Sequence, residues 1–256
     1  EKLGNHGWAA KDVMPLYEEL ECSDQIGGMR GSEGKLHVTT TKNSHKLTRA
    51  FVAAASKSGC EVNADYNGTN QEGVGYAQLS QKRGFRCSAS KAFLNPILGM
   101  DNVTLKTGTL VSKIDIQDGV AKGVFFQCKG QSEYFSADRI VLCAGAINSP
   151  KILMLSGVGD ANELDHHGID VVVDSAGVGK NLQEHPLVRL TYSTKIPSNN
   201  LTEGLVQKIK IGLRYLFYRD GPIANIFEAV AFLRTSIQQN FPDIQLHFIP
   251  MGMAYA

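Results

Sequence analysis

Residues 139–159 read RIVLCAGAINSPKILMLSGVG, and this stretch decides the fold of the chain. It opens with the apolar run Ile140–Cys143, which is short and closely bounded and therefore predicts a buried β-strand. A helix should follow at once, with Ser149 as its N-cap and Pro150 in its first position, where a missing N–H costs nothing. We expect that helix to end at Gly157, because glycine accepts the left-handed backbone that closes many helices.

The turn between the predicted strand and helix consists of the small residues Ala144, Gly145 and Ala146. A strand, a tight turn and a helix N-terminus in succession direct backbone N–H groups and a positive helix end to one place. Such a place suits a phosphate or an electron-rich ring. An ordinary βα unit, whose glycines only form turns, explains the same residues, so the local pattern leaves both interpretations open.

Composition sets wide bounds on the function. The chain has 256 residues, of which 43% are hydrophobic and 20% charged, as expected of a globular protein with one large or two modest domains. A formal net charge of +1 gives no reason to expect nucleic acid or an anionic membrane as partner. Because no stretch approaches the roughly 18 consecutive apolar residues of a membrane span, we expect no span and a cytoplasmic protein that acts on small molecules.

The cysteines and histidines predict neither disulfides nor a metal site. The cysteines are odd in number and lack CxxC spacing, so we expect free thiols in a reducing compartment. They are Cys22, Cys60, Cys87, Cys128 and Cys143. Adjacent His166 and His167 would point apart on a helix, and no acid or cysteine lies at ligand spacing from them.

Two motifs resemble signatures of the glucose–methanol–choline (GMC) flavoenzyme family. Residues 145–159, with Ser149-Pro150 followed by Ser-Gly-Val-Gly, are similar to its second signature, and residues 177–185, GVGKNLQEH, are similar to its GVG-x-NLQ-[DE]-H motif. Gly84, Arg86 and Ser88 match a softer Gly-x-Arg-x-Ser pattern. For Arg86 we weigh contact with a flavin phosphate against pairing with a carboxylate, and favour the carboxylate.

The resemblance covers nearly the whole chain and implies an α/β (mixed α+β) fold. It implies part of an FAD domain of the two-dinucleotide-binding type, with a β-meander, and part of a sheet-and-helix substrate domain. The implied divisions are residues 1–83 as lid and substrate-side segment, 84–185 as FAD-binding portion and 186–256 as substrate-binding portion. Within the FAD-binding portion, the residues implied to bind the cofactor are Val111, Ala144, Gly145, Ser149 and Gly157.

Periodicity adds the individual elements. Expected helices are 12–21, 47–58, 91–94, 164–168 and 205–218. Expected strands are 35–39, 103–105, 110–116, 121–127, 132–135, 169–173, 187–193, 228–234 and 243–250, with Asp118-Gly119 as a hairpin turn. Glycine-rich residues 27–34 should form a flexible loop, and residues 65–68 and 71–75 should form turns.

The implied activity is oxidation of a primary alcohol, choline or an aliphatic alcohol, by hydride transfer to FAD. Glu228 is the candidate substrate-binding residue, because its carboxylate could neutralise a quaternary ammonium; an edge-strand acid facing solvent is the alternative. No catalytic residue is assigned and the electron acceptor is unknown, because the family's N-terminal Gly-x-Gly-x-x-Gly unit and C-terminal catalytic histidine are not in the sequence. We therefore expect an internal piece of a longer enzyme, with an inactive or partner-completed fragment, or a flavin-dependent lyase or decarboxylase, as alternatives.

Overall fold

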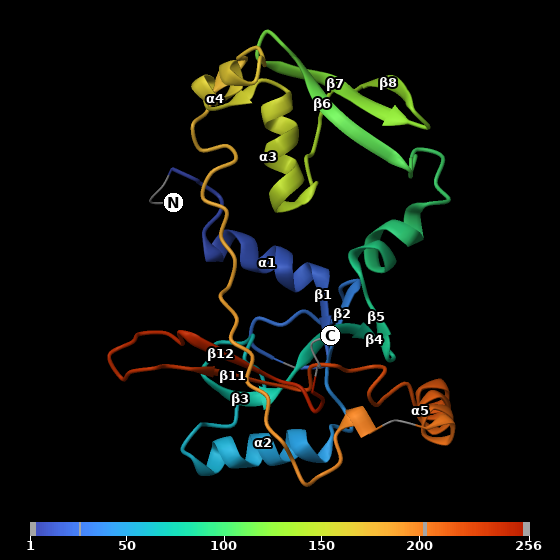
Figure 1. Cartoon of the computed structure of the whole chain (residues 1–256), viewed down its shortest axis with the longest axis vertical. Coiled ribbons are helices and arrows are strands. Elements are labelled where there is room, and N and C mark those ends of the chain that lie inside the picture. Colours follow the sequence, from blue (N-terminus) through green and yellow to red (C-terminus); the bar gives the residue numbers. More distant parts are fainter. Residues whose placement is uncertain (1–3, 26, 202–203, 253–256) are drawn as a thin grey trace. The chain divides into compact units, whose positions relative to one another are not determined.

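The computed structural model describes residues 4–25, 27–201 and 204–252, and the chain divides into two compact units. The first unit combines residues 1–103 and 190–256, and the second comprises residues 104–189 (Figure 1). Each unit is considered by itself below.

The core of the first unit lies between the sheet β12-β11-β3 and helix α2 (Lys46–Lys57). Strand β11 (Ala229–Leu233) is central and pairs antiparallel with both β3 (Gly73–Tyr76) and β12 (Ile244–Phe248). The buried side chains of this core are Val52, Val74, Ala229 and Ala231. Phe51 of α2 stacks on Phe248 with ring centroids 4.7 Å apart, which fixes the helix against the sheet. Figure 1 shows α2 beside this sheet.

Strand β3 occupies residues that we expected to form a turn. Gly73 and Gly75 are turn-forming residues by composition, but both lie in a buried strand because the backbone of residues 61–63 runs against it. A Cβ atom on Gly75 would lie 2.2 Å from the carbonyl oxygen of Asn63. The prediction of a turn at 71–75 is therefore wrong at its second half, since glycine serves here for close backbone approach.

A second sheet of the first unit has the strand order β1-β2-β4-β5. Its strands are β1 (Glu21–Ser23), β2 (Leu36–Thr40), β4 (Gln78–Lys82) and β5 (Phe85–Arg86), and helix α1 (Ala10–Leu20) precedes β1. The loop at 27–34 is anchored to this sheet by Arg30, whose side chain is only 3% exposed. Its guanidinium donates to both carboxylate oxygens of Glu21, at 2.8 and 2.7 Å, and pairs with Asp65 at 2.9 Å. The glycine-rich sequence predicted a flexible loop and gave no sign of this buried ion pair.

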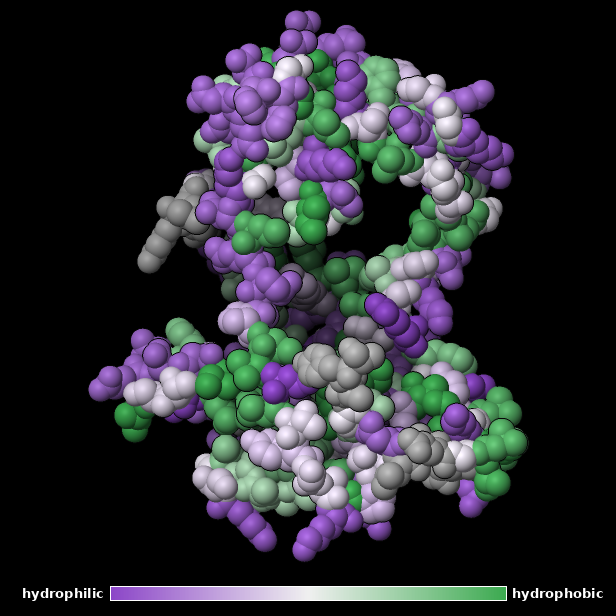
Figure 2. Space-filling model, viewed as in Figure 1, coloured by the Kyte–Doolittle hydropathy of each residue, from purple (hydrophilic) through white to green (hydrophobic). Residues whose placement is uncertain are grey.

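Helix α5 (Leu205–Tyr218) matches its predicted bounds and ends against β5. Its C-cap residue Arg219 adopts the left-handed conformation and covers Phe85, with the guanidinium carbon 4.5 Å from the ring centroid. A Cβ atom on Gly84 would lie 2.2 Å from the carbonyl oxygen of Arg219, so only glycine fits at this contact. Figure 2 shows hydrophobic side chains over α5, and several of them are more than half exposed. They include Leu205, Val206, Ile209, Leu216 and Phe217.

Short helical turns complete the first unit. The residues expected as one helix at 91–94 form a π-helical turn, η1 (Ser90–Leu94), followed by a 3₁₀ turn, η2 (Asn95–Ile97), that contains Pro96. A further 3₁₀ turn, η3, covers Asn199–Leu201.

The second unit contains the expected β-meander. Strands β6 (Thr109–Gln117), β7 (Val120–Cys128) and β8 (Gln131–Ser136) pair antiparallel in that order. Asp118 and Gly119 both have positive φ, 50° and 74°, as the predicted two-residue hairpin requires. Helix α3 (Gly145–Leu155) packs on β6. The Oγ atom of Ser156, at the end of the helix, accepts a hydrogen bond from the backbone N–H of Ile114 at 2.8 Å. Beyond it lie β9 (Val158–Gly159), α4 (Ala161–His166) and β10 (Val173–Asp174).

Three of the predicted strands are wrong, and one is shorter than expected. Residues 103–105, 140–143 and 187–193 form no strand. Val141 and Val188 are each 84% exposed, and among the described residues no backbone pairs with residues 140–143 or 187–193. A strand needs a neighbour to satisfy its N–H and C=O groups, so an apolar run alone does not make one. Of the strand expected at 169–173, only Val173 is paired, in β10.

Candidate functional site

The N-terminus of α3 lies five residues earlier than the sequence predicted. The helix begins at Gly145 with Ala144 as N-cap, so the assignment of Ser149 as N-cap and Pro150 as first residue is wrong. Ser149 still satisfies the helix end, because its Oγ accepts a hydrogen bond from the N–H of Ala144 at 3.1 Å. A side chain within the first two turns of the helix therefore provides the hydrogen-bond acceptor that we expected from a preceding N-cap residue.

This helix end is open and lined by small residues. Ala144, Gly145 and Ala146 are all exposed, and a Cβ atom on Gly145, which has φ 87°, would meet nothing within 4 Å. No acidic residue lies in the first turn of α3. Backbone N–H groups without intrahelical partners and a positive helix end are thus accessible to an anionic or electron-rich group. The donor set fits the phosphate or ring of a flavin nucleotide.

Gly157 lies at the other end of the same helix and has another role. Its φ is 82°, and a Cβ atom there would lie 2.5 Å from the carbonyl oxygen of Asp170. Eleven residues of helix rise separate it from the N-terminus by about 16 Å, so Gly157 closes α3 rather than adding to the open end. Val111 on β6 is half-buried opposite Phe126, next to a register shift. The five residues implied to bind the cofactor are therefore not gathered at one point of this unit.

Glu228 lies in the first unit, immediately before β11, and its side chain is buried with 3% exposure. The alternative of an edge-strand acid facing solvent is wrong, because β11 is the central strand of its sheet. The Oε2 atom of Glu228 accepts the hydroxyl hydrogen bond of Thr48 at 2.5 Å and the backbone N–H of His45 at 2.7 Å. Both donors belong to the start of α2, so this carboxylate is fixed at a helix N-terminus, where negative charge is favoured.

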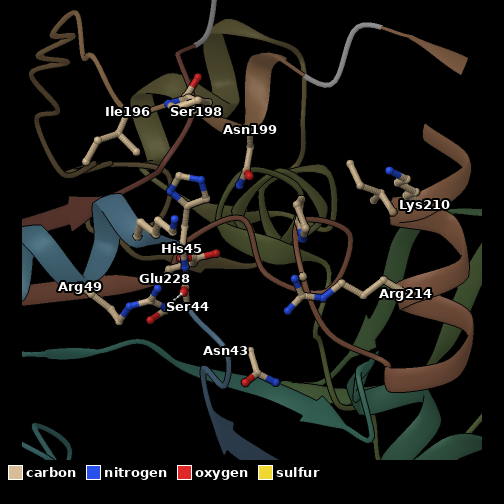
Figure 3. A pocket seen from close by; sticks show the side chains of 15 residues that line it. Asn43, Ser44, His45, Arg49, Ile196, Ser198, Asn199, Lys210, Arg214 and Glu228 are labelled. Atoms are coloured by element: carbon tan, nitrogen blue, oxygen red, sulfur yellow. Dashed lines mark hydrogen bonds between the residues drawn. The ribbon is translucent and has the colours of Figure 1, made fainter. Parts of the chain in front are cut away.

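A cavity of about 750 Å³ opens beside Glu228. Figure 3 shows Glu228, His45 and Ser44 together on one side of it, while Lys210 and Arg214 reach towards it from α5. Its cationic lining residues are Lys46, Arg49, Lys210 and Arg214. Two of these are engaged elsewhere: Arg49 donates to the Ser44 carbonyl, and Arg214 pairs with Asp220 at 2.6 Å. The Arg214 hydrogen bond lowers the pKa of the Asp220 carboxyl below its usual value.

The two oxygens of Glu228 are not equivalent. Oε2 takes both hydrogen bonds described above, and within the described ranges no donor is recorded for Oε1. Because Glu228 lines the cavity, Oε1 is the atom that could receive a cationic group from a ligand. The cavity thus combines one available carboxylate oxygen with several positive side chains.

Sequence reasoning missed the residues that surround Glu228. His45 and Thr48 bracket the start of α2, and a Ser-His-Lys-Leu-Thr segment is a plausible helix start by composition, but nothing in it points to an acid far along the chain. The predicted absence of a metal site is not contradicted: in the described residues no three His, Cys, Asp or Glu side chains come together as a metal would need. Likewise, none of the described helices has the length and apolar character to cross a membrane.

Comparison with protein-family models decides the classification. A model described as GMC oxidoreductase matches residues 1–187. The chain belongs to the GMC oxidoreductase family. The resemblance found in the two sequence motifs is confirmed, and members of the GMC family bind FAD.

Curated relatives of this GMC chain are choline dehydrogenases. The chain is 41% identical to the oxygen-dependent choline dehydrogenase of Brucella anthropi over 256 residues, which is 98% of this chain and 46% of that protein. It is also 41% identical to the enzyme of the same name from Rhizobium meliloti, over 100% of this chain and 47% of that protein. The chain therefore spans about half the length of these relatives.

Solved structures give the same fold. Pyridoxine 4-oxidase from Mesorbium loti superposes with a TM-score of 0.78 at 25% identity, over 95% of this chain and 45% of that one. An FAD-dependent oxidoreductase from Chaetomium thermophilum gives a TM-score of 0.80 at 24% identity, over 90% of this chain and 44% of that one. The predicted mixed α/β fold is confirmed at this level, while the functional division at residues 1–83, 84–185 and 186–256 stays a prediction.

Proposed function

We propose that this chain is part of an FAD-dependent dehydrogenase or oxidase that converts a primary alcohol to an aldehyde, with choline as the first substrate to test. The observation that carries the proposal is the 41% identity to choline dehydrogenases, which extends over essentially the whole chain. The open N-terminus of α3 supports it, because this end offers N–H donors that suit a flavin nucleotide.

FAD, when bound, supplies the acceptor for the hydride that leaves the alcohol carbon. In the second unit, Ala144 and Gly145 leave room for close approach to the helix end, and Ser149 holds the turn before it in place. We propose that the backbone of Val111 contacts the adenine and that Gly157 terminates α3. No described residue is assigned as the base that takes the hydroxyl proton.

With choline as the substrate, Glu228 has two roles. Its Oε2 holds the start of α2 through His45 and Thr48, and its Oε1 remains available for a trimethylammonium group. A carboxylate that is already buried and oriented loses little conformational freedom on binding a cation. The sequence identity to choline dehydrogenases and the available Oε1 atom both favour choline as substrate.

A neutral primary alcohol is the second candidate, and the charge of the cavity favours it. Lys46 and Lys210 line the cavity without an ion-pair partner among the described residues, and Arg49 and Arg214 add further positive charge. A cationic ligand would be repelled by these groups, whereas an uncharged alcohol would not. The two candidates differ in what they require of Glu228.

The deciding experiment compares choline with 3,3-dimethylbutanol, its uncharged analogue, in the full-length enzyme and in its Glu228→Gln form. If Oε1 binds the ammonium, kcat/KM for choline should fall about tenfold or more, while the value for the analogue changes little. Equal losses on both alcohols would return Glu228 to a purely structural role and favour the neutral substrate.

Thr48→Val is the matched control. This variant removes the hydroxyl that donates a hydrogen bond to Oε2 but keeps the carboxylate charge. It therefore tests the effect of a perturbed hydrogen bond without a change of charge. If Thr48→Val also lowers choline turnover selectively, the charge interpretation fails.

A further inference from the structure

A second cavity of the first unit, of about 590 Å³, has an unusual lining. It lies among β2, β4, β5 and η1, and its apolar wall includes Phe85, Cys87 and Ala92. The remaining walls are basic. The residues that contribute this charge are Lys35, Lys82, Arg83, Arg86 and Lys91, with His37 as an additional titratable group.

These five cations have no counter-charge in the part of the chain that the structure describes. No acidic side chain lines the cavity, and none of the five forms an ion pair with a described residue. The carboxylate partner that we predicted for Arg86 is thus not found. Other arginines of the same unit behave differently: Arg30 pairs with Glu21 and Asp65, and Arg234 with Glu72. The first cavity also contains lysines that are unpaired among the described residues, but Glu228 lines it, whereas no described acidic residue lines the second cavity.

The titration of His37 reports the electrostatic environment of the cavity. Partial burial, and then the positive charge of Lys82, lower the pKa of His37 below its usual value. The smaller contribution, from Lys82, has the sign expected of a cation beside an imidazole, because it disfavours the protonated form.

We propose that this cavity of the first unit binds a phosphate-bearing anion other than the flavin. A phosphate group carries more than one negative charge and several acceptor oxygens, so it can neutralise several of these cations at once. Arg83 and Arg86 provide planar guanidinium groups that bind such oxygens in pairs. The volume suits a small organic phosphate as well as a free one.

The cavity also fixes one cation by a contact other than an ion pair. The Nζ atom of Lys91 lies 5.5 Å from the centroid of Phe85, whose ring is covered by Arg219 at 4.5 Å. Such cation–π contacts hold a side chain in place while leaving its hydrogen-bond donors unused. Lys91 is therefore positioned on the wall of the cavity with its ammonium donors available for an anion.

The test is calorimetric titration of the intact, FAD-containing protein with inorganic pyrophosphate and with ADP, at low salt and without phosphate in the buffer. We expect saturable binding of one equivalent that weakens with added salt. Tighter binding of ADP identifies an organic phosphate as the ligand, and equal affinity identifies the phosphate group alone. Absence of saturable binding of both probes overturns the proposal.

Variants localise the site. Arg86→Gln and Lys82→Gln should each weaken pyrophosphate binding about tenfold, as expected for loss of a charge-assisted hydrogen bond. The matched control is Lys57→Gln, because Lys57 is an exposed lysine in the last turn of α2 and does not line the cavity. A loss in Lys57→Gln as large as in Arg86→Gln would show non-specific attraction and overturn the proposal. Melting temperatures of the three variants check that each is folded.

A proton titration of His37 separates binding from a structural effect. The groups that surround it are Lys35 just before its own strand, Lys82 on β4, Arg83 in the turn that follows, Arg86 on β5, Lys91 on η1, buried Cys87, and Cys22, its register partner on β1. Bound pyrophosphate should raise the His37 pKa, so by linkage pyrophosphate should bind more tightly as the pH falls through that pKa. In a His37→Gln variant this pH dependence should be absent. An unchanged His37 pKa at saturating pyrophosphate would contradict the assignment.

Discussion

The N-termini of α2 and α3 show two ways in which a helix end can be completed. At α2, the chain supplies its own anion: the carboxylate of Glu228 accepts from the His45 N–H and the Thr48 hydroxyl, and it is buried. At α3, the first turn contains no acidic residue, and the small residues Ala144 and Gly145 leave the end exposed.

The difference teaches where an external ligand can be held. A helix end that is already neutralised by a buried acid has few free donors for a phosphate, whereas an open end retains its donors and its positive potential.

The comparison also implies that the two helices are fixed differently. Helix α2 is held at its first turn by Glu228, whereas α3 is held by packing on β6 and by the contacts of Ser156 and Gly157 at its C-terminal end.

The largest expected effect tests that closed end of α3. Gly157→Val places a β-branched side chain at φ 82°, with its Cβ atom 2.5 Å from the Asp170 carbonyl oxygen. We expect a loss of about 4 kcal/mol in the free energy of unfolding, which combines a left-handed backbone with a steric clash. Urea denaturation of the full-length protein measures it, and flavin absorption should fall in parallel. A variant with wild-type stability would show that α3 is not fixed from this end.

The next effect tests the neutralised end of α2. Glu228→Ala leaves the Thr48 hydroxyl and the His45 N–H buried without an acceptor, so we expect a loss of about 3 kcal/mol in unfolding free energy. Glu72→Ala is the control, because it breaks only the exposed ion pair with Arg234 and should cost less than about 1 kcal/mol. If the two substitutions cost the same, the contrast between the helix ends is lost.

A smaller effect is expected at the open end of α3. Ser149→Ala removes the acceptor for the Ala144 N–H, a bond of 3.1 Å at a half-buried position. We expect a cost of about 1 kcal/mol, the usual value of one capping hydrogen bond. Thermal denaturation with and without added FAD gives the measurement. A loss above about 3 kcal/mol would mean that this end is as firmly integrated as that of α2.

The smallest effect concerns Gly177, the first glycine of the GVG motif at residues 177–185. Gly177 is exposed, its φ lies outside the left-handed region, and a Cβ atom there would meet nothing within 4 Å. Unlike Gly157, Gly177 therefore has no local geometry that requires glycine. We predict that Gly177→Val changes the unfolding free energy by less than about 0.5 kcal/mol, and a large loss would show a requirement that the local geometry does not contain.

Local sequence signals were sufficient for much of the fold. The helices α2 and α5 and the hairpin at Asp118-Gly119 were placed within about two residues, because periodicity and turn chemistry act over a few neighbouring positions. The strands expected at 140–143 and 187–193 failed because pairing depends on residues elsewhere in the chain.

The candidate sites show the same limit. The motif located the α3 N-terminus, but it put the helix start at Ser149 because Ser-Pro is a common start signal. That Glu228 is buried could not be read from the alternation of β11, which gives the face of a side chain but not its partners. The pairing of Arg30 with Asp65, and the gathering of unpaired cations around Arg86, also depend on contacts across several elements.

The central position of β11 has a consequence for how the chain is made. Among the described strands, β3 at Gly73–Tyr76 pairs with Ala229–Leu233, and its other backbone contact is a single bridge between Val62 and Val74. The sheet must therefore wait for a strand that leaves the ribosome roughly 10 to 30 s later, at 5–20 residues per second. The meander at 109–136 pairs locally and can fold meanwhile. We therefore expect the second unit to become protease-resistant on nascent chains that end before residue 229, and the first unit only on longer ones. Simultaneous protection of both units in arrested chains of graded length would disprove this order of folding.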